Sequence, residues 1–472
     1  MSAVTRRPRP APVAAPCTCG YPTLLRARAR ALAARSRQEP LLHNGRLLAA
    51  SSLLSAGLGS LFWVLATRSY SAAEVGRSYT ALSATMFLST LGSLNLGDAL
   101  VRFVPTAGRR TRSLVLRCYL VAATGSAAVA VAFLLLVPAV APALGELRRP
   151  VLAVAFVAAT AGYAVFVLQD GALTGVRRAG WVLGENTLFA VAKAALLTLC
   201  AAFAVGTGIL LSWAAALVLA IAATNLVLFR SAVPAHQAVP AADTGGPRPP
   251  ERIARWAGAD YLGNLFTFAG TTVLPLMVLD RLGADGSAYY SLAYVIASTL
   301  YVAAFSMGHS LVVEGTRDPA RLAEHARRLL RHSTLLVTAA ALPIAAAAPW
   351  ILGLFGPDYA ARGSTALRLM ALSAIPNTVP NVVLQIARVR RALPWMVGVR
   401  LAFAATVVAL TAALLPPFGL TGIGAAWLIA ECAIALPLLA ALPRLLAPAP
   451  APGRPRPEGG ADMSTSPEEE PT

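Results

Sequence analysis

The chain has 472 residues, and 57% of them are apolar even before its 36 glycines are counted, whereas soluble proteins usually reach ~45–50% with glycine included. Charged residues make up 13%, about half of the usual ~25%, and the mean hydropathy is +0.64. So little charge cannot cover the surfaces of the soluble domains that this length would form. The composition excludes an ordinary soluble enzyme, a disordered chain and a disulfide-stapled secreted domain, and it predicts a polytopic membrane protein.

The formal charge of +19 comes from 39 arginines and a single lysine, Lys193, against 21 acidic residues. A chain this basic could bind nucleic acid, but arginines in the loops of a membrane protein explain the charge better, and we expect no nucleic-acid partner. The five cysteines have no further Cys or His at metal-ligand spacing, so we expect no metal site and no cofactor; they are Cys17, Cys19, Cys118, Cys200 and Cys432.

The two ends of the chain are rich in Pro and Ala. Residues 1–45 add many arginines and contain no apolar stretch of signal-peptide length, and residues 446–472 end in three consecutive glutamates. Both compositions are typical of disordered tails.

Between the tails, a bilayer of ordinary thickness requires about 20 mostly apolar residues per helix. The sequence predicts an all-α protein with about twelve such spans. They cover residues 46–66, 79–104, 114–137, 151–174, 182–204, 208–229, 258–280, 287–313, 333–355, 365–387, 395–415 and 421–442. The longest loop, 231–257, divides them into an N-terminal six-helix lobe over 46–230 and a C-terminal six-helix lobe over 258–445.

The arginines test this assignment, because successive loops must alternate between the two sides of the membrane. Seven of the 39 fall on one side, and the other 32 fall on the side of both tails and the long loop. The positive-inside rule then places both termini in the cytoplasm. The seven are Arg68, Arg77, Arg148, Arg149, Arg281, Arg362 and Arg368.

A weak internal repeat relates the two halves. Residues 76–82 read GRSYTAL at the start of the second span, and 286–292 read GSAYYSL at the start of the eighth. Near the other ends of these spans, 97–101 read GDALV and 308–312 read GHSLV. Two six-helix halves in the same orientation imply a pseudo-twofold axis along the membrane normal, with a substrate site between the halves. Chance similarity of small apolar residues is the alternative.

Polar residues inside the spans are costly and should face protein or water. Lys193 lies midway along the fifth span and shares a helical face with Asn186, so we interpret both as contacts to an anionic cargo. In the second span Asn95, Asp98 and Arg102 share a face. Arg102 is a second candidate for the cargo and Asp98 a candidate for ion coupling, although both lie near a span end, where long side chains reach the interface or pair locally.

Further polar stripes lie in the C-terminal half. In the seventh span Asp260, Asn264, Thr267 and Thr271 form a stripe before Pro275, which should interrupt the backbone. In the tenth span Asn377, Asn381 and Gln385 share a face, and Pro376 and Pro380 should break the helix. We expect a wet cavity, with cargo-binding candidates Asp260, Asn264, Tyr301, Asn377, Asn381 and Gln385, and coupling candidates Asp98, Asp260, His309 and Glu431.

The link between the eighth and ninth spans holds Asp318-Pro319, which is typical of a helix start, followed by leucines and arginines. We expect a separate helix on the inner membrane surface over 319–331, or else a solvated connector helix.

Four segments carry a family resemblance. Residues 59–66 read GSLFWVLA, 92–105 read GSLNLGDALVRFVP, 168–179 read LQDGALTGVRRA and 419–428 read GLTGIGAAWL. Together with the layout of residues 46–442, they resemble the oligosaccharide flippases and polysaccharide exporters of the multidrug/oligosaccharidyl-lipid/polysaccharide (MOP) superfamily. The alanine and arginine bias resembles that of high-GC actinobacteria.

The resemblance implies a MATE-like architecture, in which a cationic cavity between two lobes carries a lipid-linked saccharide across a bacterial cell membrane by alternating access. The expected partners are this lipid and the bilayer, with H⁺, Na⁺ or the membrane potential as driving force. A cation-coupled exporter of small molecules, of the multidrug type, is the alternative. A membrane glycosyltransferase would need a large catalytic outer loop, and no predicted outer loop exceeds about fifteen residues, so we expect no enzyme.

Overall fold

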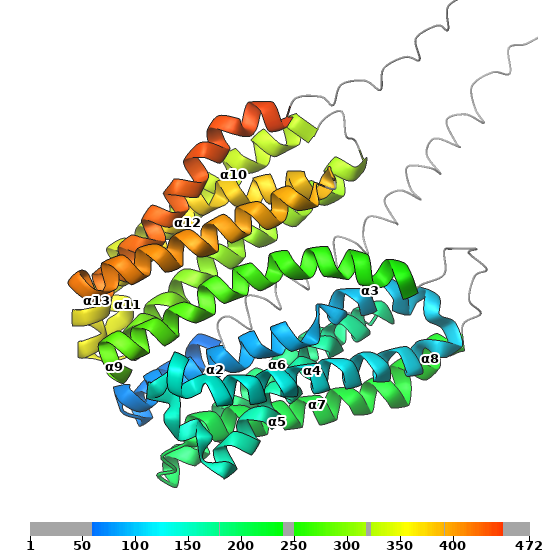
Figure 1. The fold of residues 1–472 in the computed structure, drawn as a ribbon, viewed down its shortest axis with the longest axis horizontal. Helices are drawn as coiled ribbons and strands as arrows, with labels where there is room; N and C mark the ends of the chain where they lie inside the picture. The colour runs from blue at the N-terminus through cyan, green and yellow to red at the C-terminus, as the bar shows by residue number, and fades with distance from the viewer. Residues whose placement is uncertain (1–58, 179, 239–249, 318–321, 391, 447–472) are drawn as a thin grey trace, which may run out of the picture.

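The computed structural model describes residues 59–178, 180–238, 250–317, 322–390 and 392–446, and it describes only the backbone of residues 140, 250–260, 262–264, 267–269, 271, 306–317, 393 and 394. All elements of the described part are helices, and they run side by side along one direction (Figure 1). They are a helix over 59–69, α2 (Ala72–Ser93), α3 (Leu96–Ala107), α4 (Thr111–Val140), α5 (Pro150–Gly175), α6 (Gly180–Ala202), α7 (Gly208–Val227), α8 (Val233–Gln237), α9 (Pro250–Arg317), α10 (Leu322–Ala346), α11 (Ala348–Gly353), α12 (Pro357–Val389) and α13 (Leu393–Leu446), joined by short turns η1 (Gly108–Arg110), η2 (Pro142–Arg148) and η3 (Leu228–Ala232).

The two longest elements are helical hairpins. The chain of α9 reverses at Gly283, with φ 75°, and that of α13 reverses at Gly419, with φ 55° (Figure 1). A side chain at such positive φ values is strained, so glycine permits these reversals within one or two residues. The hairpins correspond to spans seven with eight and eleven with twelve.

The predicted all-α membrane fold is confirmed. Eight stretches of the described residues are long and apolar enough to cross a bilayer, and three of them, Leu96–Ala139, Thr272–Phe305 and Trp395–Leu446, each include parts of two predicted spans. The second predicted span covers parts of α2 and α3 and the ninth covers parts of α10 and α11, whereas each other span from the third to the twelfth coincides with one helix or one arm of a hairpin. The helix over 59–69 covers the described end of the first. The predicted tail 1–45, the predicted tail 446–472 apart from Leu446, and residues 239–249 of the predicted linker 231–257 lie outside the described residues.

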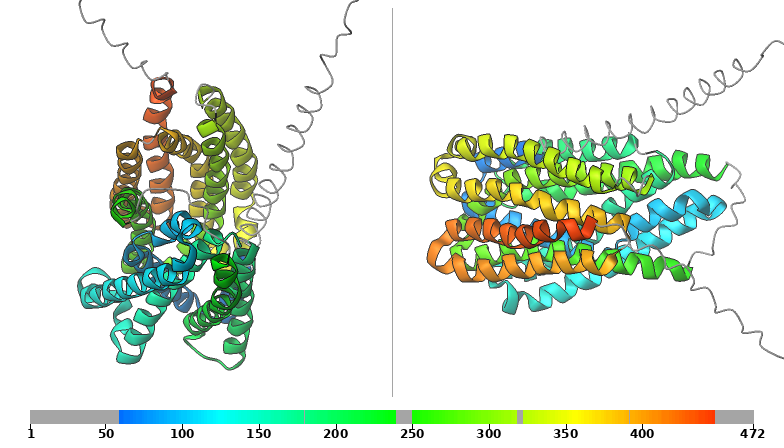
Figure 2. Two further views of the ribbon diagram at one scale, coloured as in Figure 1. Left: turned by 90° about the vertical axis from the view of Figure 1, so that its right-hand side faces the viewer. Right: turned by 90° about the horizontal axis from the view of Figure 1, so that it is seen from above.

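The helices form two groups, one of α2 to α8 and one of α10 to α13 with the second arm of α9 (Figures 1 and 2). The groups meet where α2 lies against α9, and a Cβ added at Gly76 would overlap the carbonyl oxygen of Ala284. One turn further along α2, the hydroxyls of Thr80 and Ser287 are 2.8 Å apart. The two copies of the predicted repeat, 76–82 and 286–292, therefore pack against each other across the boundary between the groups.

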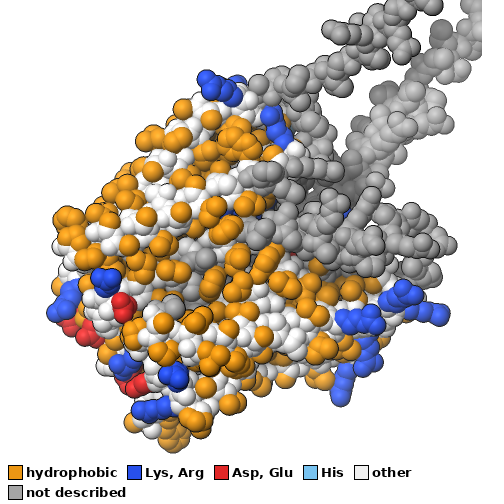
Figure 3. Space-filling model, in the orientation of Figure 1, with side chains coloured by type: hydrophobic (Ala, Val, Ile, Leu, Met, Phe, Trp, Pro, Cys, Tyr) orange, Lys and Arg blue, Asp and Glu red, His pale blue; other side chains and the backbone are white. Residues whose placement is uncertain are grey.

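On the face drawn in Figure 3, an apolar band lies between two charged ends. The large apolar side chains exposed on the described helices include Leu135, Val151, Val154, Phe203 and Trp350. Only basic side chains are visible among the coloured residues at the right-hand end in Figure 3, whereas acidic and basic ones mix at the opposite end, where α9 reverses its direction in Figure 1. This distribution is the one that a bilayer-spanning bundle requires.

The second span is two helices rather than one. Ser71 starts α2 with a capping box, in which Glu74 accepts a hydrogen bond from the Ser71 backbone N–H at 3.0 Å. The helix then ends at Leu94 and Asn95, which both adopt positive φ, and α3 begins at Leu96. Asparagine tolerates this conformation better than most residues, so Asn95 marks a joint in the span.

Two expectations for the backbone are wrong. The three prolines Pro275, Pro376 and Pro380 do not break their helices, and α9 and α12 continue through them. Neighbouring helices and side-chain hydroxyls can satisfy the carbonyls that proline frees in a membrane bundle. The link helix over 319–331 is also not separate, because residues from Leu322 onward form the first turns of α10, and Leu322 and Leu330 pack with Ile386 and Leu442 of the C-terminal group.

The glycines of the family-like segments have a packing role that we test at Gly171. A Cβ at this position of α5 would overlap the carbonyl oxygen of Gly97 on α3. We expect Gly171→Ala to lower the melting temperature of the detergent-purified protein by several degrees, because overpacking costs about 1–3 kcal/mol. Gly184→Ala on α6 is the matched control, since a Cβ there makes only an ordinary 3.8 Å contact with Trp181. Equal melting temperatures for the two variants would contradict the packing role.

Candidate functional site

Lys193 lies on α6 among aromatic rings. Its Nζ is 5.0 Å from the ring centroid of Phe62 on the helix over 59–69, and 5.2 Å from that of Phe189, one turn earlier on α6. The side chain is half-buried. The rings stabilise the cation by about 0.5–2 kcal/mol, depending on how far it is desolvated.

No carboxylate neutralises Lys193 in the part of the chain that the structure describes, where the one ion pair joins Arg281 to Asp280. A structural pairing of Lys193 with Glu185 or Glu431, which is the alternative to a cargo contact, is therefore absent among these residues. Among the described residues, no acidic side chain compensates the charge of Lys193 next to Phe62 and Phe189.

The aromatic surroundings extend through the N-terminal group. Phe62 contacts Trp63, which in turn packs on Tyr79 of α2, with ring centroids 5.3 Å apart in both pairs. Phe189 packs on Phe166 of α5 at 5.0 Å and on Trp213 of α7 at 5.8 Å. These rings fix the position of Lys193 relative to several helices.

In the C-terminal group the structure brings three of the predicted residues together. Asn377 of α12 donates its amide N–H to Glu431 of α13 at 2.8 Å, and Asn381 donates to the Asn377 side chain at 2.6 Å. Glu431 is 1% exposed, and its second oxygen has no hydrogen-bond partner among the described residues. The arrangement is a buried carboxyl with one oxygen available for a proton, an ion or water.

Two further predicted residues lie near this group with different roles. Tyr301 interacts electrostatically with Glu431, but its hydroxyl is bonded to α12, donating to the Met370 carbonyl at 2.9 Å and pairing with Ser373 at 2.7 Å. Its ring stacks on Trp427. Gln385 is 0% exposed, and neither end of its amide has a partner in the described residues.

The polar residues of the second span lie at its joint. The Asn95 amide donates to Asp98 at 3.0 Å, and Asp98 and Arg102 are both exposed on α3. Arg102 also lies over the ring of Phe103. The described contacts join neither residue to the Lys193 region or to the Glu431 group. Asn186 of α6 donates to the Val182 carbonyl at 3.0 Å.

Other predicted residues cannot be placed. Asp260, Asn264, Thr267, Thr271 and His309 belong to α9, but their side chains lie outside the described residues.

The structure adds a polar cluster that is not among the predicted site residues, formed by Gln169, Asp170, Glu185 and Asn225. Gln169 donates to Asn225 of α7 at 2.9 Å, and Asp170 interacts electrostatically with Glu185. The signal was available, because Asp170 and Glu185 lie about equally far from the short link between α5 and α6, and an antiparallel pair of helices brings such positions together.

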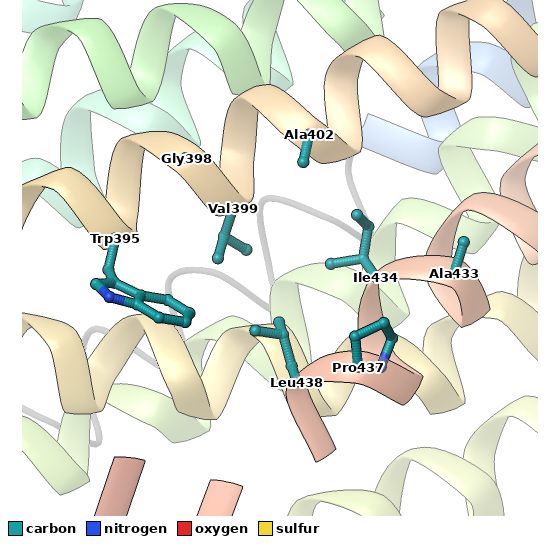
Figure 4. Close-up of a pocket in the computed structure, with 8 residues that line it drawn as sticks. All are labelled: Trp395, Gly398, Val399, Ala402, Ala433, Ile434, Pro437 and Leu438. Carbon is teal, nitrogen blue, oxygen red and sulfur yellow. The ribbon is translucent and has the colours of Figure 1, made fainter. Parts of the chain in front are cut away.

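An apolar groove lies between the two arms of α13 (Figure 4), with a volume of about 420 Å³. Several of its residues are exposed on the surface of the apolar band. It is lined by Trp395, Gly398, Val399, Ala402, Ala433, Ile434, Pro437 and Leu438. Such a lining suits a hydrocarbon chain and offers nothing to a charged group.

No family model matches the sequence, and no curated protein matches it. Solved structures share the fold. An inward-facing multidrug resistance MATE family transporter of the MOP superfamily aligns with a TM-score of 0.63 and 14% identity, over 83% of this chain and 94% of its own. The lipid II flippase MurJ in an inward closed conformation aligns with a TM-score of 0.62 and 11% identity, over 84% and 87%. The MATE multidrug transporter DinF-BH in complex with R6G aligns with a TM-score of 0.57 and 15% identity, over 84% and 95%.

The expected MATE-like architecture is thus confirmed over most of the chain. The identities are too low to carry more than the fold, and the neighbours include both multidrug transporters and a flippase. The choice between these activities depends on the chain's own residues.

The contact between Asn377 and Glu431 gives a testable coupling. Removing the amide in Asn377→Ala leaves both carboxyl oxygens of a buried side chain without partners, so we expect a lower melting temperature. In a double-mutant cycle with Glu431→Leu, which removes the acceptor, thermal unfolding should give a coupling energy of about 1 kcal/mol or more. A control cycle combines Asn377→Ala with Asp280→Asn, at an exposed residue distant from Asn377 in the sequence. The two changes in unfolding free energy should then add to within about 0.5 kcal/mol. Additivity in both cycles would contradict the contact.

Proposed function

We propose that this chain is a MOP-superfamily transporter, not an enzyme, that moves a lipid-linked saccharide from the cytoplasmic to the outer leaflet of a bacterial cell membrane by alternating access. The fold supports transport, and the positive charge of Lys193 favours an anionic cargo. A saccharide on a phosphate or diphosphate is too polar to cross hydrocarbon unaided. An uncompensated cation among aromatic rings offers such a headgroup both a counter-charge for the phosphate and flat apolar faces for the sugar.

The groove on α13 supports the lipid part of the cargo. Its lining is apolar throughout, and its volume of about 420 Å³ accommodates a length of acyl or isoprenoid chain. In this proposal the headgroup passes between the lobes, while the tail stays in the bilayer at the apolar surface. Arg102, Asn186, Asn377, Asn381 and Gln385 remain proposed contacts to the headgroup, together with Asp260, Asn264 and Tyr301.

The contact between Gly76 and Ala284 supports alternating access. It joins the two lobes near the Gly283 end, where the repeats meet. Rocking of one lobe against the other would separate these small residues and open the site at that end. H⁺, Na⁺ or the membrane potential drives the cycle, and Glu431, with its unpartnered oxygen, is a coupling group in this scheme, as are Asp98, Asp260 and His309.

Export of small molecules is the second candidate. The buried Glu431 next to Asn377 favours it, because a carboxyl that changes its charge suits cation-coupled exchange, and a MATE neighbour was solved with R6G. A positively charged small molecule would be repelled by Lys193, which favours the saccharide.

The orientation of this transporter follows from the arginine distribution, with both termini in the cytoplasm. We expect a topology reporter fused after Gly206 to be outside and one fused at Thr244 to be inside, because the positive-inside rule assigns the arginine-rich long loop to the cytoplasm and the link after the fifth span to the other side. Protease protection in spheroplasts provides the readout. The reverse result at either site would exclude the orientation.

The role of Lys193 is tested by flipping of a fluorescent lipid-linked diphosphate saccharide in proteoliposomes. We expect Lys193→Ala to lower the initial rate by about tenfold or more, since a hydrogen bond to a charged group contributes about 1.5–3 kcal/mol. Lys193→Arg should retain part of the rate, because it keeps the charge.

Thr198→Ala, at an exposed position of the same helix whose hydroxyl bonds only to the Ala195 carbonyl among described groups, is the matched control and should flip at the wild-type rate. Membrane abundance of all three variants is measured in parallel. Wild-type flipping by Lys193→Ala, or a loss of rate that follows a loss of abundance, would refute the assigned role.

A further inference from the structure

The end of the bundle at which α9 reverses its direction contains contacts between the two lobes. Gly76 lies against Ala284 there, and the hydroxyls of Thr80 and Ser287 are 2.8 Å apart. The short helix α11 lies at the same end (Figure 1). We call it the outer end, because the arginine distribution predicts that it faces away from the cytoplasm.

A guanidinium group crosses the boundary between the lobes at the outer end. Arg68 is the last residue but one of the helix over 59–69, in the N-terminal lobe. Its Nε and Nη2 donate to the backbone carbonyl of Leu354 at 3.2 and 2.8 Å. Leu354 follows α11 in the C-terminal lobe, 286 positions further along the chain. We call these two hydrogen bonds the Arg68 latch.

The carbonyl that accepts these bonds belongs to a helix end. A helix leaves its last carbonyls without donors of its own, and the three hydrogen bonds that close the turn after α11 are accepted by residues 351–353. No backbone N–H of the described residues donates to the Leu354 carbonyl. Arg68 therefore satisfies an acceptor that the C-terminal lobe leaves without a donor in the part of the chain that the structure describes.

No described carboxylate competes for Arg68. The nearest acidic residue in the sequence is Glu74, which is bound by the Ser71 backbone N–H at 3.0 Å and by the Ser71 hydroxyl at 2.8 Å in the capping box of α2. The ion pair that the structure shows among the described residues joins Arg281 to Asp280 and does not involve Arg68. The guanidinium is thus available for the Leu354 carbonyl, and its charge strengthens both hydrogen bonds.

The packing of the lobes against each other differs between the two ends of the bundle. Leu352 and Phe355, on either side of Leu354, are buried in one apolar cluster with Phe62 and Val75 of the N-terminal lobe. At the opposite end, each buried apolar cluster of the described residues belongs to one lobe alone. The described cores of the lobes are therefore joined at the outer end and separate at the other, and the latch lies where they are joined.

We propose that Arg68 is a positioning residue for transport, whose hydrogen bonds to the Leu354 carbonyl hold the outer ends of the two lobes together until the lobes rock apart. The proposal rests on the proposed function only in that the lobes move against each other. Arginine keeps its charge at every physiological pH, so movement of the lobes and not titration breaks the latch. Because the acceptor is a backbone carbonyl, the latch depends on the side chain of Arg68 and not on that of Leu354.

Distances between two spin labels test the latch in the full chain in lipid nanodiscs, without cargo. The labels replace Glu146 of η2 and Ala361 of α12, which are exposed near the outer end, after the five native cysteines are changed to serine. The unmutated latch should give mainly the short distance. Arg68→Ala should raise the ratio of long to short distances by about three- to tenfold, as expected for exposed hydrogen bonds from a charged group. Arg68→Lys keeps one charged donor and should give an intermediate ratio.

A second pair of labels distinguishes rocking of the lobes from local loosening of the turn after α11. It replaces Ser113 of α4 and Glu324 of α10, which are exposed near the opposite end. If Arg68 holds the lobes in position, this pair should move closer in Arg68→Ala, in the same fraction of molecules in which the outer pair separates. Local loosening would lengthen the outer distance alone.

Two matched controls should keep the distances of the unmutated latch. Leu354→Ala removes an exposed side chain and keeps the backbone acceptor, and Arg77→Ala removes another exposed arginine that the arginine distribution places on the outer side. If Arg68→Ala does not reach the membrane, Arg68→Lys provides the same comparison.

Unchanged distances in the Arg68 variants, an outer change without the reciprocal one, or an equal change in Leu354→Ala would overturn the proposal. A protein with an unmutated latch that shows mainly the long outer distance would also overturn it. Because none of these measurements uses cargo, failure of saccharide flipping would refute the proposed function and leave the latch standing.

Discussion

The structure depends on one constraint, which is that the interior of a bilayer provides no water to satisfy polar groups. Helices satisfy their own backbone, so the chain uses helices for every element that the structure describes. Each polar side chain inside the bundle then needs a partner within the protein or a ligand. Asn377 and Glu431 meet this need with each other, Lys193 meets it with the faces of Phe62 and Phe189, and Gln169, Asp170 and Glu185 meet it only in part.

The same environment removes the hydrophobic drive for helices to associate, because lipid is as apolar as leucine. Association then depends on close packing, which explains why glycines lie at the contacts between α3 and α5 and between α2 and α9. At the boundary between the lobes, Gly76, Thr80, Ala284 and Ser287 are all small. A contact made of small residues and one pair of hydroxyls holds two lobes together without a large apolar surface that would prevent their separation.

The sequence was sufficient for the helices and for their order, because hydropathy and length are strong signals in a membrane protein. It placed Asn377, Asn381 and Glu431 inside spans and the two asparagines on one face, but it did not predict that Asn377 contacts Glu431. Prediction from the sequence failed where tertiary contacts determine the local backbone conformation. Neighbouring helices determine the joint at Leu94 and Asn95, which local rules for asparagine do not predict. They also allow α12 to continue through Pro376 and Pro380, where local rules for proline predict a break. The pair of Asp170 and Glu185 is not among the predicted site residues, because its interaction joins two helices across a link and is not visible in the pattern of either span alone.

The central claim is that the cargo is an anionic lipid recognised through an uncompensated cation, and direct binding tests it best. Native mass spectrometry of the purified protein should show a complex with a lipid-linked diphosphate saccharide, weaker binding of the same lipid without its headgroup, and loss of the difference between the two in Lys193→Ala. Binding of cationic dyes with no preference for the diphosphate lipid would contradict the claim and favour export of small molecules.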